Sequence, residues 1–265
     1  MRGKDISDDL HSINNMHLQN NGSSIRLAML SNKGKAQLCN HEMKTFTVTN
    51  MFVEQIVFCG SDWVAFLGYR KNGRNSDDAV VKKLEEQPQF LEIFSQMNIG
   101  VCLHSIKTET GNLILDVATQ GIDTLAIAGR DGSVTVKQLL VRDKTNSYVY
   151  DDVSNQVITS NDIHFERHSK NKIDRVVYVG CEPADYVACS GPTLYCGASE
   201  YETTLRSSVT QLEAFIGGGS ESVMLVAGLG RTGQIEIVDA ATLTRQVSIS
   251  QGKLFSIDSL AVVDE

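Results

Sequence analysis

The sequence predicts an all-β protein built from repeated units of about four strands. Short runs rich in β-branched residues recur along the 265 residues, and most end at a small residue or glycine before a polar turn. The clearest example is LAIAGRDGSVTV, residues 125–136, where Asp131-Gly132 separates two such runs. An Asp-Gly turn favours a hairpin because glycine accepts a positive φ without steric cost. Only one stretch, residues 76–97, has a helical pattern instead.

The spacing of the units indicates how they are arranged. Two further copies cover residues 174–197 and 222–246, and Gly129, Gly180 and Gly228 fall at the same place in their copies, 51 and 48 residues apart. Blades of β-propellers are four-stranded sheets of about 40 to 50 residues. We therefore expect a propeller-like fold, with an antiparallel sandwich as the alternative.

The N-terminal third contains two more hairpin patterns. Residues 23–40 carry an Asn-Lys-Gly turn between apolar runs, and residues 53–69 carry a Ser-Asp turn. Both segments resemble the clearest example, with two apolar runs separated by a polar turn. We expect these hairpins to belong to the same series of sheets.

The segment after the second hairpin predicts an insertion over residues 70–98, with a short helix over 76–97. Ser76 is a suitable N-cap, and the two aspartates that follow it lie where the helix dipole favours negative charge. Pro88 is expected to break or kink this helix, because proline cannot donate the backbone hydrogen bond.

The C-terminal residues 256–263 resemble the first strand of a further unit. Either this strand pairs with the N-terminal sheet and closes a ring, or another segment or subunit completes the ring. Residues 1–265 are accordingly expected to form a single propeller-like domain.

Charge and composition limit the classes of partner. The chain has 24 Lys and Arg against 32 Asp and Glu, a net charge of -8, whereas a general nucleic-acid binder needs a basic face. No apolar run approaches the ~18 residues that span a bilayer, and the N-terminus has no apolar signal region. We therefore expect protein partners and no membrane association.

The six cysteines show no C-x-x-C spacing, and most lie in apolar runs. This usage is typical of buried free thiols in a reducing compartment, so we expect an intracellular protein, cytoplasmic or nuclear. Cys181, Cys189 and Cys196 are close enough in sequence to meet on neighbouring strands.

Two motifs suggest chemistry, and both have a simpler explanation. GLGRTG, residues 228–233, matches the dinucleotide-binding fingerprint, but QIEIV follows with the period of a strand where a helix is required. HFERH, residues 164–168, brings two histidines close, but no third metal ligand is evident. We therefore expect no catalytic, cofactor-binding or metal-binding residues, no cofactor and no enzyme activity. A metal-dependent hydrolase on an all-β scaffold, using His164 and His168, stays as an alternative.

Two hairpins resemble the repeats of WD40-type propellers. LAIAGRDGSVTV carries the first part of such a repeat, and VMLVAGLGRTGQIEIVDAAT places Val238-Asp239 where Trp-Asp would stand. The resemblance covers roughly residues 112–150 and 213–263, and the repeats are degenerate, with no Gly-His and no Trp-Asp dipeptide anywhere. It implies a non-catalytic scaffold for protein–protein interaction, a subunit of a larger intracellular complex.

Partner-binding residues are expected near the insertion, which begins with the basic residues Arg70, Lys71 and Arg74. Trp63 lies beside a turn, where it serves either the core or a contact surface. With Arg142, the three basic residues also suggest an alternative, a nucleic-acid-associated complex subunit of the DNA-repair or RNA-processing type.

Overall fold

The computed structural model describes most of residues 13–250. The segments left out within that range are 21–24, 32–34, 40–44, 49, 61–62, 71–86, 96–97, 110–111, 122, 144–155, 217–221 and 231. The described part is all-β, and no helix in it has the length and apolar character to cross a membrane. The chain divides into two compact units, residues 1–113 with 141–159, and residues 114–140 with 160–265.

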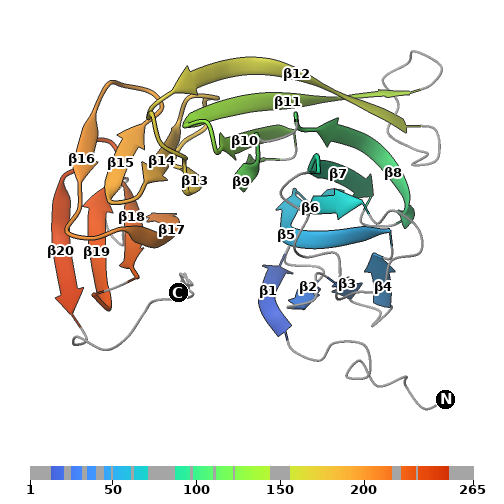
Figure 1. The fold of residues 1–265 in the computed structure, drawn as a ribbon, viewed down its shortest axis with the longest axis horizontal. Coiled ribbons are helices and arrows are strands. Elements are labelled where there is room, and N and C mark those ends of the chain that lie inside the picture. The colour runs from blue at the N-terminus through green and yellow to red at the C-terminus, as the bar shows by residue number, and fades with distance from the viewer. Residues whose placement is uncertain are drawn as a thin grey trace. The chain divides into compact units, whose positions relative to one another are not determined.

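The strands of the described residues form five four-stranded sheets, and each sheet takes its four strands in chain order (Figure 1). Sheets 1 and 2 belong to the first unit. Sheet 1 consists of β1 (Ile13–Asn20), β2 (Ile25–Ser31), β3 (Ala36–Cys39) and β4 (Thr45–Val48). Sheet 2 consists of β5 (Met51–Cys59), β6 (Trp63–Arg70), β7 (Phe90–Ser95) and β8 (Asn98–Lys107).

Sheets 3, 4 and 5 belong to the second unit, except that the end of β11 and the start of β12 fall in the first. Sheet 3 consists of β9 (Ile114–Gln120), β10 (Thr124–Gly129), β11 (Ser133–Asp143) and β12 (Gln156–Arg167). Sheet 4 consists of β13 (Arg175–Tyr178), β14 (Tyr186–Ser190), β15 (Thr193–Cys196) and β16 (Glu202–Thr204). Sheet 5 consists of β17 (Val209–Ile216), β18 (Val223–Leu229), β19 (Gln234–Asp239) and β20 (Arg245–Ser250). Four antiparallel strands in chain order are the unit of a propeller, so the predicted all-β, propeller-like class is confirmed.

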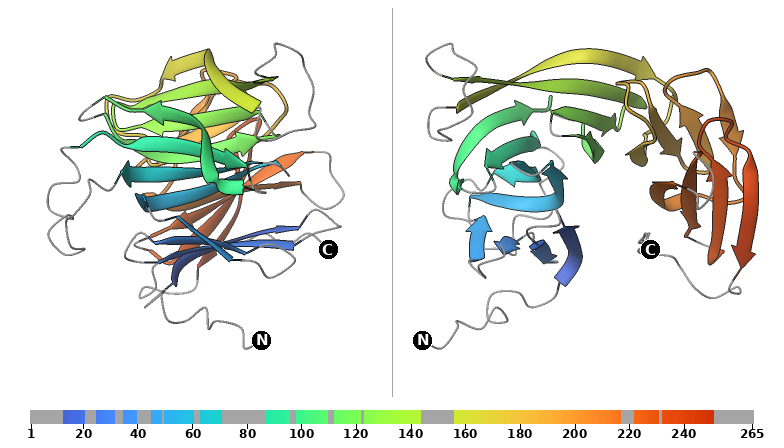
Figure 2. Two further views of the ribbon diagram at one scale, coloured as in Figure 1. Left: turned by 90° about the vertical axis from the view of Figure 1, so that its right-hand side faces the viewer. Right: turned by 180° about the vertical axis from the view of Figure 1, so that it is seen from behind.

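Within each unit, the cores lie between the faces of consecutive sheets. In sheet 4, Tyr186 and Ala188 pack against sheet 3, while Val187 and Cys189 pack against sheet 5. Successive strand residues point to opposite faces, so a strand between two sheets is apolar throughout. This explains why β14 reads as the unbroken run YVACS, buried at every position. Sheets 4 and 5, orange to red, lie next to each other in the right-hand view of Figure 2.

The glycine spacing predicted that Gly129, Gly180 and Gly228 occupy equivalent positions in their sheets, and this prediction is wrong for Gly180. Gly129 ends β10 and Gly228 lies near the end of β18, both second strands of their sheets, but Gly180 follows the first strand β13. The equivalent position in sheet 4 is Ser190, at the end of β14. The second strands of the five sheets end 39, 59, 61 and 39 residues apart, from Ser31 to Leu229. The spacing varies because the turns and links between strands differ in length.

The helix predicted over residues 76–97 is also corrected. Phe90–Ser95 is strand β7, which pairs with β6 on one side and β8 on the other. The run FLEIF places apolar residues at spacings that fit a helix face, but a strand between two neighbours, buried on both faces, gives the same pattern. Residues 76–86, like the C-terminal strand predicted at 256–263, lie outside the described residues.

Candidate interaction site

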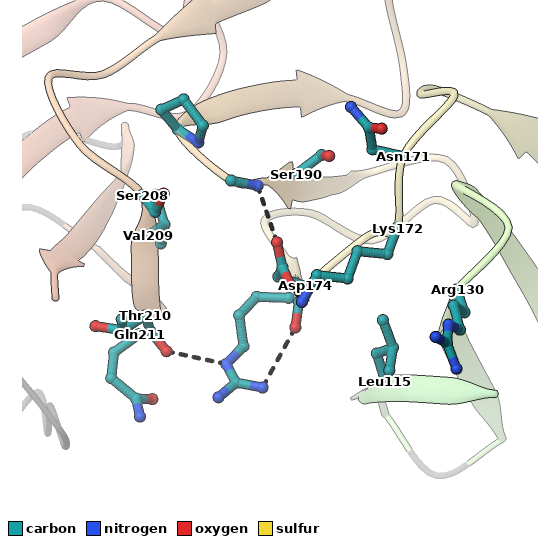
Figure 3. A pocket seen from close by; sticks show the side chains of 13 residues that line it. Leu115, Arg130, Asn171, Lys172, Asp174, Ser190, Ser208, Val209, Thr210 and Gln211 are labelled. Atoms are coloured by element: carbon teal, nitrogen blue, oxygen red, sulfur yellow. Dashed lines mark hydrogen bonds and ion pairs between the residues drawn. The ribbon is translucent and has the colours of Figure 1, made fainter. Parts of the chain in front are cut away.

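An open groove of about 980 Å³ lies in the second unit, where turns of sheets 3, 4 and 5 come together (Figure 3). We call it the turn groove. Its lining comes from the β10–β11 turn, the β12–β13 link, the β14–β15 turn, and the β16–β17 link with the start of β17. The charged and polar lining residues are Arg130, Asn171, Lys172, Asp174, Arg175, Ser190, Ser208, Thr210 and Gln211.

Backbone hydrogen bonds hold the walls of the turn groove. The Asp174 amide donates to the Cys189 carbonyl over 2.7 Å, and the Val209 amide donates to the Gly191 carbonyl over 2.9 Å. In the same way, the Ile173 amide donates to the Gly129 carbonyl over 3.1 Å. The β12–β13 link is therefore attached to the ends of β10 and β14, and the start of β17 is attached to the β14–β15 turn. A ligand would meet a preformed site and would lose little affinity in ordering it.

Asp174 lies at the centre of the groove, and both of its carboxylate oxygens have partners (Figure 3). One oxygen accepts from the Gly191 amide over 2.9 Å, and the other pairs with the Lys172 ammonium over 2.7 Å. Arg175 donates to the Thr210 carbonyl over 3.1 Å and to the Asp174 carbonyl over 3.3 Å. These contacts neutralise the one carboxylate of the lining.

Positive charge is left in excess. The lining has three cationic side chains against one carboxylate. Arg130 is exposed, and its guanidinium has no hydrogen bond or ion pair to another described residue. The Lys172 side chain is 59% exposed. The groove is thus suited to an anionic group, since an arginine can bind a carboxylate with two hydrogen bonds.

The structure describes two of the four sequence-predicted contact residues, Trp63 and Arg70, and they lie at opposite ends of one strand. Trp63 begins β6 and is 4% exposed, packed within sheet 2. Arg70 ends the same strand, about 23 Å away at the usual rise per residue. Lys71 and Arg74 lie outside the described residues.

Arg70 is occupied by contacts within sheet 2. Its Nε donates to the Glu92 carboxylate over 2.6 Å, and its guanidinium also contacts the Ser105 hydroxyl. The same group lies 4.2 Å from the centre of the Phe90 ring. Glu92 is 1% exposed, so Arg70 compensates a buried charge.

The residues of the turn groove were missed in the sequence because they lie in short turns and links. The available signal was indirect: Arg130 precedes a predicted Asp-Gly turn, and Lys172 to Arg175 stand immediately before a predicted strand. Nothing in the spacing indicated that these turns meet.

The histidines of HFERH lie on one face of β12 and its end. The Glu166 carboxylate lies 3.6 Å from His164 Nε2 and 3.7 Å from His168 Nδ1. His168 Nε2 is 2.8 Å from the Tyr186 hydroxyl, and its ring stacks on Tyr195. Burial lowers the pKa of His168, although the Glu166 carboxylate acts in the opposite direction. Within the described residues, no three His, Cys, Asp or Glu side chains are placed to hold one metal ion.

The second motif, GLGRTG, covers the last two residues of β18 and the turn that follows, and the predicted strand after it is β19 (Gln234–Asp239). The hairpin interpretation of its glycines is confirmed, because β18 and β19 pair as antiparallel neighbours.

The cysteines are free, and the prediction of burial holds for Cys39, Cys59, Cys189 and Cys196. It is wrong for Cys102 and Cys181, which are exposed. Burial raises the pKa of Cys59 and of Cys189 to about 12. Cys189 and Cys196 lie in one core between sheets 4 and 5, without a disulfide.

Comparison with known proteins shows the fold alone. No protein-family model matches the chain, and no curated protein matches it. Solved structures share its fold, among them the following three. A chain of the mitotic checkpoint complex has a TM-score of 0.58 and 11% identity, over 93% of this chain and 67% of that one. AztD of Citrobacter koseri has a TM-score of 0.51 and 12% identity, over 92% of this chain and 60% of that one. Raptor of Chaetomium thermophilum has a TM-score of 0.52 and 12% identity, over 94% of this chain and 21% of that one.

Proposed function

We propose that this chain is a non-catalytic, WD40-like interaction subunit of an intracellular complex, and that its turn groove binds an extended acidic segment of a partner protein. The observation that carries the proposal is the groove itself, a preformed site whose one carboxylate is neutralised and whose Arg130 is unpaired among the described residues.

The shape of the groove favours an extended segment. A space of about 980 Å³ that is open along the turns of three sheets accommodates several residues of a peptide. Hydroxyl and amide side chains such as Ser190, Thr210 and Gln211 offer hydrogen bonds to a peptide backbone. Arg130 and Lys172 would then select for acidic side chains.

Three further observations support the proposal. They favour a scaffold rather than an enzyme, and they favour a location inside the cell. The groups that most resemble catalytic ones are His164, Glu166 and His168. Glu166 contacts both histidines, and both histidines contact the buried ring of Tyr186, which gives the group a packing role. Cys59 and Cys189 are free thiols within cores, as is usual in a reducing compartment. One of the similar structures is a chain of the mitotic checkpoint complex.

The test is a charge reversal in the groove with a matched control. Arg130→Glu reverses the unpaired cation, and Arg206→Glu makes the same change at an exposed arginine of the same unit that does not line the groove. Tagged wild-type and variant chains are purified from native extract, and the associated proteins are quantified by mass spectrometry.

We expect Arg130→Glu to reduce recovery of a fixed partner by about 10-fold or more, because a charged hydrogen bond contributes about 1.5–3 kcal/mol. Arg206→Glu should leave recovery unchanged. Direct titration with a peptide from that partner, against its Glu→Gln and Asp→Asn version, then measures the charge dependence. Equal recovery with both variants would refute the groove as the site, and loss of the partner on nuclease treatment would favour a nucleic-acid-associated subunit.

A further inference from the structure

Sheet 5 packs one face against sheet 4, and its other face, which is largely apolar, is not part of a core with another sheet of the second unit. Strand register places seven apolar residues on this face, Phe215, Met224, Val226, Ile235, Ile237, Val247 and Ile249, because directly opposed residues of neighbouring strands share a face. The polar residues of the same face, Gln211, Glu213 and Asp239, lie on β17 and at the end of β19, and none of them is on the edge strand β20. We call this face the outer face of sheet 5. Val247 is 46% exposed and Ile249 is 44% exposed, and the other five apolar residues are partly buried.

The opposite face of sheet 5 shows what a covered face looks like. Its residues Leu212, Leu225, Ala227 and Val238 are at most 6% exposed and pack against sheet 4 in one core. Sheet 4 is covered on both faces, by sheets 3 and 5. A row of isoleucine and valine at nearly half exposure on a sheet face is therefore unusual in this unit and indicates a missing layer.

The chain itself continues directly from this sheet. Residues 251–265 follow β20, and the run LFSIDSLAVV, residues 254–263, is mostly apolar. Its part IDSLAVV matches IDTLAIA, residues 122–128, position by position in residue type. Residues 124–128 of that sequence lie in β10, the second strand of sheet 3, where every one of them is buried, so the match supports a buried strand but does not give its position within a sheet.

The lengths of the links between sheets place this run at the right distance. Two, six, seven and four residues separate β4 from β5, β8 from β9, β12 from β13, and β16 from β17. A further strand of the series would therefore begin between residues 253 and 258, which is where the apolar run starts. Length and composition both fit a strand that follows sheet 5 in the series.

We infer that residues 251–265 dock an apolar strand on the outer face of sheet 5 and supply the layer that this face lacks. The contact is made by Val247 and Ile249 on the edge strand and by Ile235 and Ile237 beside them. It belongs to a different surface from the turn groove, so the two proposals stand or fall separately.

The test uses hydrogen–deuterium exchange of the full chain. We expect the amides of residues 254–263 to exchange at least about 10-fold more slowly than in an unstructured peptide of the same sequence. Ile249→Lys should abolish that protection, since it places a charge in the apolar contact. Ser248→Lys is the matched control, an equally exposed neighbour on the opposite face of β20, and should retain the protection.

A second variant keeps the test informative if Ile249→Lys prevents sheet 5 from folding. Leu260→Asp changes the tail and not the sheet, so it should release residues 254–263 while amides of β18 keep their protection. An unprotected tail in the wild-type chain would overturn the inference. So would a protected tail that neither variant releases, or a dimer in light scattering that Ile249→Lys dissociates, because a second copy would then cover the face.

Discussion

Gly132 offers the sharpest test of how the turns are held together. Its φ is +85°, its carbonyl accepts hydrogen bonds from the amides of His168 and Ser169 over 3.1 and 3.2 Å, and its own amide donates to Gly129. A Cβ at this position would overlap the carbonyl oxygens of Ser169 and Asn171, which are backbone atoms. Gly132→Ala therefore cannot be accommodated by moving a flexible side chain.

The expected loss of stability has two parts. A left-handed backbone costs a non-glycine residue about 1 kcal/mol. Displacing the segment that begins at His168 breaks two backbone hydrogen bonds, at about 1 kcal/mol each. Gly132→Ala should thus lower the free energy of unfolding by about 3 kcal/mol, measured by urea titration.

Gly121 supplies the control, because its φ is +57° but nothing lies within 4 Å of an added Cβ. Gly121→Ala should cost only the conformational part, about 1 kcal/mol. Equal losses in the two variants would refute the reasoning, since they would show that the contact between the β10–β11 turn and the β12–β13 link contributes nothing.

Three other perturbations test the contacts described above. Arg70→Met should lower the free energy of unfolding in urea by about 2 kcal/mol, because it leaves the buried carboxylate of Glu92 without its cationic partner. The loss is moderated because the Arg70 side chain is 48% exposed, and an unchanged unfolding midpoint would contradict the reasoning. A thiol reagent at pH 8 should modify Cys181 in the native protein and Cys59, whose pKa is raised to about 12, only after unfolding, and rapid native labelling of both would count against the described burial. Burial lowers the pKa of His168 below its unfolded value, so the unfolded chain binds more protons and stability should fall as pH drops from about 7 to 5. His168→Gln should flatten this part of the pH profile, and an identical profile in the variant would argue against a titrating His168.

The repeated hairpin pattern was sufficient to predict the class of fold, but it did not show which strand of each sheet a given run of residues forms. The Asp-Gly turn identified the β10–β11 hairpin correctly, because the backbone of that turn demands glycine. Gly180 carries no such demand: its φ is not positive, and it follows a first strand, so it resembled Gly129 in sequence only.

The helix and the contact residues were harder to predict from the sequence, for physical reasons. Phe90–Ser95 is apolar on both faces as a strand between two neighbours, so no alternation distinguished it from a helix. Arg70 was selected as an exposed cation, but its contact with Glu92 depends on a pairing between β6 and β7 that sequence spacing does not show. The turn groove depends on three turns meeting, which is a tertiary property.

The links in the second unit are attached to their neighbouring turns mainly through peptide groups, as in the pairs Asp174–Cys189 and Val209–Gly191. A peptide group is the same in almost every amino acid, so these joints tolerate side-chain replacement. The surface of the turns can then change in sequence without loss of the scaffold. This property is compatible with the identity of only 11 to 12% between the chain and solved structures that share its fold.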